Sequence, residues 1–239
     1  NPSAPKRLVF AYAKMTLASV LLMPEPKYIL VVGLGGGTLP MAFNRLFPNA
    51  IIHAIEIDTA VTKVAKKYFD FTESNQIKVF DQDGRVFTKR AMANSFKYDL
   101  IILDAFNGDY IPEHLMTQEY LQENKAILSE KGLLASNTFT TSALYDHEST
   151  TYASVFDPLI NFKRPETNNR ILLAPNESID RAQIISRAKM YEARMEEFNV
   201  PIVDYAENIL DALNGQPDWD TGARVLTDQY SPANLLNSR

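Results

Sequence analysis

The sequence predicts an α/β fold built on a doubly wound, mostly parallel sheet. First, short apolar runs alternate with helical patterns along most of the 239 residues, as in parallel sheets that are covered on both faces. Second, the first apolar run leads straight into a glycine loop, in "YILVVGLGGGTLPMAF" at 28–43. Third, acidic residues or glycines follow four of the first five runs. Because ligands bind beyond the carboxyl ends of such strands, these positions form the candidate site.

Six runs of strand length justify the sheet. The runs at 28–32 and 98–103 are almost wholly apolar, as expected of strands buried on both faces. We expect further strands at 51–56, 76–80 and 132–136, and a late one at 170–174. The positions to inspect directly follow these strands: 33–38, 56–58, 81–85, 104–109 and Asn137.

Apolar residues at helical spacing predict helices at 38–47, 60–69, 120–128 and 180–198. Thr38 is the expected cap of the first of these, and Pro40 is tolerated in its first turn. The elements suggest a helical lead-in at 1–24, a nucleoside-binding catalytic domain at 25–178, and a helical extension at 179–239 packed on that domain. Because the chain begins at Asn1 rather than Met, we expect upstream sequence to be missing.

Composition excludes several classes of function. The chain has no cysteine, and its three histidines (His53, His114 and His147) lie far apart without ligand spacing, so we expect no metal site. A net charge of −5 argues against nucleic-acid binding. No signal peptide is visible, and the apolar run at 15–23 is too short to span a bilayer. We therefore expect a cytoplasmic protein without membrane insertion, and a homodimer is compatible with the sequence.

The glycine loop and the end of the second strand predict a nucleoside site. Glycines let the backbone approach a ligand closely, and Glu56 and Asp58 lie about 20 residues beyond them, where a carboxylate can accept both ribose hydroxyls. Asp58 has a second interpretation, as the cap of the following helix. The loop lacks both GK[ST] and the GxGxxG spacing, so a nucleoside without a pyrophosphate fits better.

Two further acids follow strands. Asp83, with Gly84 beside it in "DQDGRVF", is placed to accept a hydrogen bond from an exocyclic adenine amine, although an ordinary Asp-Gly turn remains the alternative. Asp104 ends a strand expected to be central and buried. A buried carboxylate must be hydrogen-bonded or functional, so Asp104 is the first candidate for the catalytic residue.

The order GLGGGTL, EID, DGR and YDLIILDAF…IP…LMTQEYL resembles the spermidine/spermine synthase family, the polyamine aminopropyltransferases, over about residues 5–175. The tail "ARVLTDQYSPANLL" at 223–236 resembles the ending of the bacterial spermidine-synthase-like branch. The resemblance implies the class I S-adenosylmethionine-dependent methyltransferase fold. It also implies decarboxylated S-adenosylmethionine as the co-substrate, with no tightly bound cofactor, and an amine such as putrescine as the acceptor.

The resemblance also implies a role for each matching residue. Asp104 would position and deprotonate the attacking amine, and Tyr12 would lie near the polyamine channel. The implied nucleoside residues are Glu56 at the ribose hydroxyls, Asp83 at the adenine amine, and Gly33, Gly35 and Gly36 along the thioether and ribose.

The sequence departs from the family pattern around the amine. Gly35 replaces an acid of the glycine loop, Asn107 replaces the acid three residues after the catalytic one, and Asp109 is displaced by two positions. Lys14 stands close to Tyr12. These changes predict weak or altered use of diamines, with Asp109 and Glu148 as acids that would otherwise complete the groove. A methyltransferase that uses ordinary S-adenosylmethionine on a small molecule, and a non-catalytic nucleoside-binding domain, remain alternatives.

Overall fold

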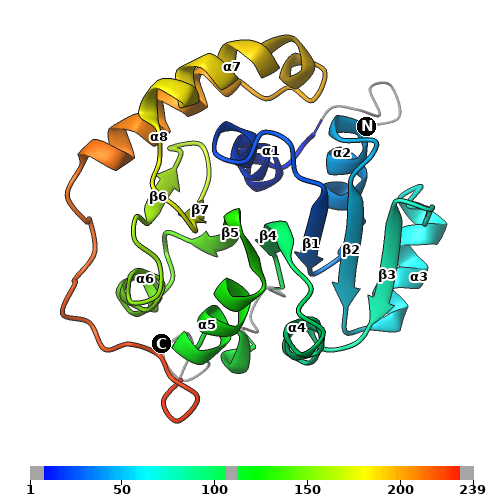
Figure 1. The fold of residues 1–239 in the computed structure, drawn as a ribbon, viewed down its shortest axis with the longest axis horizontal. Helices are drawn as coiled ribbons and strands as arrows, with labels where there is room; N and C mark the ends of the chain where they lie inside the picture. Colours follow the sequence, from blue (N-terminus) through cyan, green and yellow to red (C-terminus); the bar gives the residue numbers. More distant parts are fainter. Residues whose placement is uncertain (1–7, 106–111, 232–239) are drawn as a thin grey trace.

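A seven-stranded sheet forms the centre of the molecule. The computed structural model describes residues 8–105 and 112–231, and its strands run in the order β3-β2-β1-β4-β5-β7-β6 (Figure 1). Neighbours from β3 to β5 are parallel, and β7 is antiparallel to both β5 and β6. The predicted doubly wound, mostly parallel sheet is therefore confirmed. The strands are β1 (Tyr28–Val32), β2 (Ile51–Glu56), β3 (Ile77–Asp81), β4 (Tyr98–Leu103), β5 (Leu128–Phe139), β6 (Ile160–Lys163) and β7 (Asn169–Pro175).

The strand order reverses at β1, and this position fixes the site. Val32, the last residue of β1, pairs with Ile55 of β2 on one side and with Leu103 of β4 on the other. The chain thus winds outward in opposite directions from the β1–β4 pair, which makes a topological switch point. Ligands bind outside the carboxyl ends of the strands at such a point, beside Gly33 and Asp104.

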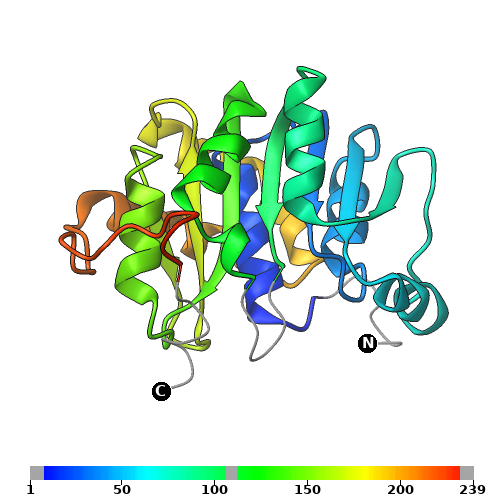
Figure 2. The same cartoon turned by 90° about the horizontal axis from the view of Figure 1, so that it is seen from below.

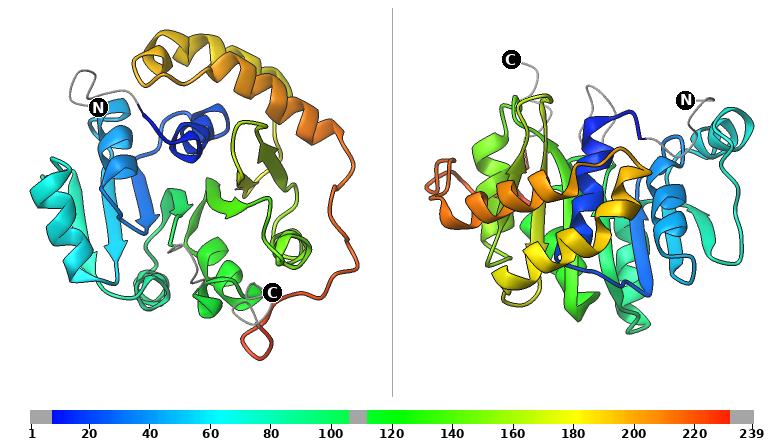
Figure 3. Two further views of the ribbon diagram at one scale, coloured as in Figure 1. Left: turned by 180° about the vertical axis from the view of Figure 1, so that it is seen from behind. Right: turned by 90° about the horizontal axis from the view of Figure 1, so that it is seen from above.

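Helices cover both faces of the sheet. Helices α1, α2, α3, α7 and α8 share one hydrophobic core with one face, and α4, α5 and α6 share a second core with the other. Figure 2 shows α4, α5 and α6 in front of the sheet, and Figure 3 shows α7 and α8 lying outside α1. The helices are α1 (Ala11–Leu17), α2 (Thr38–Leu46), α3 (Thr59–Tyr68), α4 (Gly84–Ala93), α5 (Gln118–Ala126), α6 (Tyr145–Ala153), α7 (Arg181–Glu196) and α8 (Ile202–Asn214), with short 3₁₀ helices η1 (Ala18–Leu21) and η2 (Glu113–Leu115).

The structure corrects several sequence-based boundaries. Thr38 was predicted as the cap of α2, but it is the first helical residue, and Gly37 takes the cap position with a left-handed φ of 76°. The strand expected at 132–136 is the middle of β5, which extends to twelve residues because it pairs with β4 on one side and β7 on the other. Residue 128, expected at the end of a helix, begins that strand.

The helices at both ends of the described chain pack into the same core as the sheet. Met15 of α1, Ile184 of α7 and Ile209 of α8 are fully buried with Ile29 of β1. The division at 24 and 178 stays a prediction. Within residues 8–105 and 112–231, no helix is both long and apolar enough to cross a membrane.

Candidate active site

The glycine loop after β1 brings two strand ends into contact. Gly33 adopts φ +99°, and a Cβ atom there would lie 2.2 Å from the carbonyl oxygen of Asp104, so only glycine fits between β1 and β4. Gly36 faces the ring of Phe69, and Gly37 lies against Phe71. Gly35 differs, because a Cβ placed there would meet no atom of residues 8–105 and 112–231 within 4 Å. Among these residues, the loop therefore leaves space beside Gly35 for a ligand.

Glu56 bridges the ends of β1 and β2. Its Oε2 accepts from the backbone N–H of Leu34 at 3.1 Å, and its Oε1 accepts from the N–H of Asp58 at 3.0 Å. A carboxylate offers about four lone-pair sites, so roughly two remain for a pair of ribose hydroxyls. The geometry suits the predicted ribose contact, which stays a prediction.

Asp58 and Asp83 both cap helices. Asp58 caps α3 by accepting from the N–H of Ala60 at 2.8 Å, as its alternative interpretation predicted. Asp83 caps α4 through the N–H of Val86 at 2.9 Å. The alternative of an ordinary turn is therefore wrong, since Gly84 begins a helix. Ligand contacts of Asp58, Asp83 and Gly84 stay predictions.

Asp83 has a second partner, because its Oδ2 lies 2.8 Å from Nε2 of His114 in η2. Burial alone would raise the pKa of Asp83, but the bonds from His114 and the Val86 N–H outweigh it and hold that pKa below its ordinary value. Gly84, the next residue, packs tightly against the end of β1, since a Cβ there would lie 2.5 Å from Cγ1 of Val32. The carboxylate predicted to meet adenine is thus charged and in contact with a half-exposed histidine.

Asp104 lies at the carboxyl end of β4, at the switch point. Its backbone N–H donates to the carbonyl of Val32 at 2.8 Å, and its Oδ1 accepts from Nδ2 of Asn137 at 2.9 Å. Burial raises the pKa of Asp104 to about 6, although the bond from Asn137 opposes this shift. Such a carboxylate is ionised near neutral pH and still takes up a proton more readily than an ordinary aspartate, which suits a general base.

Tyr12 of α1 is close enough to sense the charge of Asp104. Burial, and then the negative charge of Asp104, raise the pKa of Tyr12 to about 12, so its phenol is neutral. The structure thus brings together two predicted site residues, one from the lead-in at 1–24 and one from the domain at 25–178. Asn107 and Asp109 lie outside the described residues.

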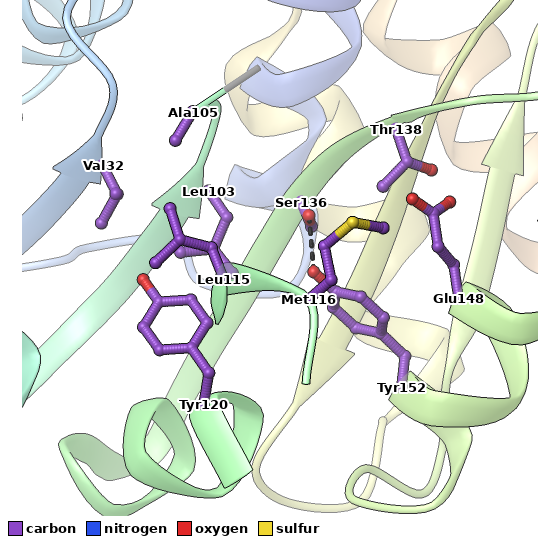
Figure 4. A pocket seen from close by; sticks show the side chains of 10 residues that line it. All are labelled: Val32, Leu103, Ala105, Leu115, Met116, Tyr120, Ser136, Thr138, Glu148 and Tyr152. Carbon is purple, nitrogen blue, oxygen red and sulfur yellow. Dashed lines mark hydrogen bonds between the residues drawn. The ribbon is translucent and has the colours of Figure 1, made fainter. Parts of the chain in front are cut away.

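A small cavity lies behind the strand ends, between the sheet and helices α5 and α6 (Figure 4). Its volume of about 20 Å³ suits roughly one water molecule and is too small for a nucleoside. Glu148 lines it but is buried against Arg170, with 3.0 Å between Oε2 and Nη2. Glu148, named above as an acid that would complete an amine groove, is therefore committed to a buried ion pair.

Sequence reasoning missed that residues 215–231, which follow α8, brace the site through Asp228. Arg85 follows Asp83 in α4, and its guanidinium binds Glu123 of α5 and both carboxylate oxygens of Asp228, the latter at 2.6 and 2.8 Å. These two carboxylates raise the pKa of Arg85 above its ordinary value. Figures 1 and 2 show this segment, drawn in orange to red, passing α6 on its way to α5. The only signal was the motif "LTDQYSP", to which the sequence assigned no role.

Comparison with known proteins places this geometry in a family. Residues 9–159 match the model of the spermine/spermidine synthase domain. The chain belongs to this family. One relative is the polyamine aminopropyltransferase of Vibrio vulnificus (strain CMCP6), which is 47% identical over 97% of this chain and 77% of that protein. The eEF1A lysine and N-terminal methyltransferase of Homo sapiens is 31% identical over 72% of this chain but only 26% of that protein.

Solved structures agree on the fold of this synthase-family chain. Human methyltransferase-like protein 13, in complex with SAH, has a TM-score of 0.68 at 24% identity and covers 90% of this chain and 97% of that one. Spermidine synthase from Thermotoga maritima has a TM-score of 0.61 at 22% identity and covers 87% of this chain and 72% of that one. The predicted family and the predicted methyltransferase-type fold are both confirmed.

Proposed function

We infer that the chain is a polyamine aminopropyltransferase, which transfers an aminopropyl group from decarboxylated S-adenosylmethionine to an amine. The observation that carries this inference is the 47% identity to the Vibrio vulnificus enzyme over nearly the whole chain. The site geometry supports it, because Asp104 stands at the switch point beside a glycine loop that is open at Gly35.

The nucleoside would lie along the carboxyl ends of β1, β2 and β3. Glu56 has lone pairs left for the ribose hydroxyls after bonding the N–H groups of Leu34 and Asp58. Asp83, charged at the start of α4, would accept from the adenine amine once the nucleoside replaces or joins His114. The loop at Gly33, Gly35 and Gly36 would leave space for the thioether. No step requires a resident cofactor.

The chemistry is displacement at the methylene next to the sulfonium. The amine nitrogen forms a bond to that carbon, the carbon–sulfur bond breaks, and 5′-methylthioadenosine leaves as a neutral thioether. An alkylamine is protonated near neutral pH and cannot attack in that form. Asp104 would orient the amine and take its proton, and a positioned base of this kind contributes ~10²–10⁴-fold. The remaining acceleration would come from holding the two substrates in line.

Tyr12 would act at the amine side of the site. Its pKa of about 12 keeps the phenol neutral, so it can donate a hydrogen bond without adding a second negative charge beside Asp104. The acceptor is an amine, putrescine or a relative. Since Glu148 is paired with Arg170, the weak use of diamines expected from Gly35, Asn107 and Lys14 stays part of the proposal.

One experiment separates this function from its alternatives. The protein is incubated with either decarboxylated or ordinary S-adenosylmethionine and with a panel of mono-, di- and triamines, and products are identified by mass spectrometry. Aminopropylated amine together with methylthioadenosine is the expected result. Methylated product from ordinary S-adenosylmethionine would favour a methyltransferase, and nucleoside binding without turnover would favour a binding domain. Rapid spermidine formation at micromolar putrescine would contradict only the expected weak use of diamines.

A further inference from the structure

A line of side-chain hydrogen bonds leads away from Asp104 through the sheet. Asn137 of β5 donates from Nδ2 to Oδ1 of Asp104 at 2.9 Å. Asn169, the first residue of β7, donates from Nδ2 to Oδ1 of Asn137 at 3.0 Å. Thr167 in turn donates from Oγ1 to Oδ1 of Asn169 at 3.0 Å. Every donor in this line points toward Asp104. The side-chain oxygen of each asparagine accepts a hydrogen bond from the next residue in the line, Asn169 for Asn137 and Thr167 for Asn169.

We propose that Asn137 and Asn169 are positioning residues, which assign the two oxygens of Asp104 different tasks and favour its ionised form. The proposal rests on the proposed function of Asp104 as the base. Because Oδ1 is occupied by the Asn137 amide, the proton from the substrate amine goes to Oδ2. An amide N–H also binds a carboxylate more strongly than a neutral carboxyl group, so the line opposes premature protonation of Asp104.

The orientation of Asn137 depends on Asn169. An amide can present either its nitrogen or its oxygen to Asp104, and only the nitrogen suits a carboxylate. Asn169 places an N–H₂ group at Oδ1 of Asn137, which makes the other orientation a donor-to-donor contact. Thr167 donates its hydroxyl to Oδ1 of Asn169, and its Oγ1 also accepts from the backbone N–H of Asn169 at 3.1 Å. Asn169 and Thr167 therefore act on Asp104 only indirectly, through the amide of Asn137.

The surroundings of Asp104 make the effect of the Asn137 hydrogen bond on its ionisation large. Val32 at the end of β1 and Gly33 after it carry no titratable group, and β5 supplies the neutral Asn137. Within the described part of the chain, Tyr12 of α1 is a titratable group whose pKa the charge of Asp104 raises. Asn137 is only 6% exposed, so water competes little for its amide. A donor in such a place holds its orientation and strengthens the ionised form of its acceptor.

The test compares Asn137→Ala and Asn169→Ala with a matched control, Thr140→Val. Thr140 bonds the carbonyl of Asn168 through its hydroxyl at 3.1 Å, so it stabilises the same turn without joining the line. Carbon-13 NMR of labelled aspartate follows the titration of Asp104 in the unliganded protein, with Asp104→Asn to assign the signal. The pH dependence of kcat/KM is measured in parallel, and thermal unfolding checks that each variant is folded.

We expect Asn137→Ala to raise the titration midpoint of Asp104 by roughly half to one pH unit, the equivalent of one lost hydrogen bond. Asn169→Ala should shift the midpoint in the same direction by less, although it does not touch Asp104. The double variant should shift it no further than Asn137→Ala alone, because the two residues act in series. The acid limb of kcat/KM should move with the midpoint, and Thr140→Val should leave both unchanged.

The proposal is overturned if folded Asn169→Ala leaves the Asp104 midpoint unchanged, or if Thr140→Val shifts it equally. Asn169→Ala decides the matter even if Asn137→Ala fails to fold. The NMR titration uses no substrate, so it is independent of the proposed reaction. An enzyme without aminopropyltransferase activity but with the expected midpoint shifts would refute the proposed function and leave the positioning line intact.

Discussion

Replacing Glu56 with glutamine tests the nucleoside site with little change of shape. In the native structure both carboxylate oxygens accept backbone N–H groups, from Leu34 at 3.1 Å and Asp58 at 3.0 Å. A glutamine amide has one oxygen, so it can satisfy only one of these donors. Its N–H₂ group would face the other donor and would no longer accept from a ribose hydroxyl.

The size of the effect follows from these contacts. A hydrogen bond to a charged group contributes about 1.5–3 kcal/mol. Glu56 is half-buried, which lowers the cost to the unliganded protein, and we expect a loss of about 1–2 kcal/mol in the free energy of unfolding. The ribose contact adds a loss of about 1–3 kcal/mol in the binding of 5′-methylthioadenosine, which is roughly a fivefold to hundredfold weaker affinity.

Isothermal titration calorimetry with 5′-methylthioadenosine measures the affinity, and urea unfolding measures the stability. Asp180→Asn is the matched control, because Asp180 caps α7 through the Ala182 N–H at 3.0 Å and asparagine caps a helix as well as aspartate does. Unchanged affinity in folded Glu56→Gln would refute the assignment of Glu56 to the ribose. A loss of stability without a loss of affinity would mean that Glu56 only joins the two loops.

Four further predictions concern Asp104, His114 and the glycine loop. Asp104→Asn should lower turnover by ~10²-fold or more while the affinity for methylthioadenosine changes little, and normal turnover in the variant would refute the role of Asp104 as base. In the wild-type protein, turnover should fall as the pH drops below about 6, where Asp104 protonates. Because the pKa of Asp104 is raised in the folded state, its ionisation destabilises the protein as the pH rises from about 4 to 6, so Asp104→Asn should gain stability relative to wild type at pH 8 but not at pH 4 in urea unfolding. His114→Ala should strengthen methylthioadenosine binding by up to about fivefold in calorimetry, since it removes a partly exposed competitor for Asp83, whereas weaker binding would indicate that the histidine itself contacts the ligand. Gly33→Ala should cost far more thermal stability than Gly35→Ala, because only the former drives a Cβ into the Asp104 carbonyl, and equal losses would contradict the tight contact of β1 and β4.

The bounds of three central strands, β1, β2 and β4, could be predicted from the sequence. β1 and β4 are almost wholly buried, and such strands appear in the sequence as nearly continuous apolar runs. α6 escaped prediction because its buried residues include Glu148, Ser149 and Thr151, which carry no apolar period. α4 was obscured by an Asp-Gly pair that resembles a turn but starts a helix.

The candidate site likewise contains residues that a local pattern predicts and residues that depend on long-range strand pairing. Glu56, Asp83 and Asp104 were predictable because each follows a parallel strand, and parallel strands end at one edge. Asn137 was among the positions to inspect, but its bond to Asp104 depends on the register of β5. Asn169 was not predictable, because its place next to Asn137 comes from an antiparallel pairing that a local pattern does not contain.

The bond between Arg85 and Asp228 has a consequence for the synthesis of the protein. The two residues are 143 positions apart, so the brace beside the nucleoside site can close only after almost the whole described chain has left the ribosome. A nascent chain that ends before Asp228 leaves the mostly buried Arg85 with Glu123 as its remaining carboxylate partner. Domains fold largely from the N-terminus during synthesis, so the sheet can form early, whereas the brace beside its ligand site closes only after Asp228 has emerged. Activity would then appear only after this point, and a nascent chain that ends before Asp228 would not bind the nucleosides of the cell.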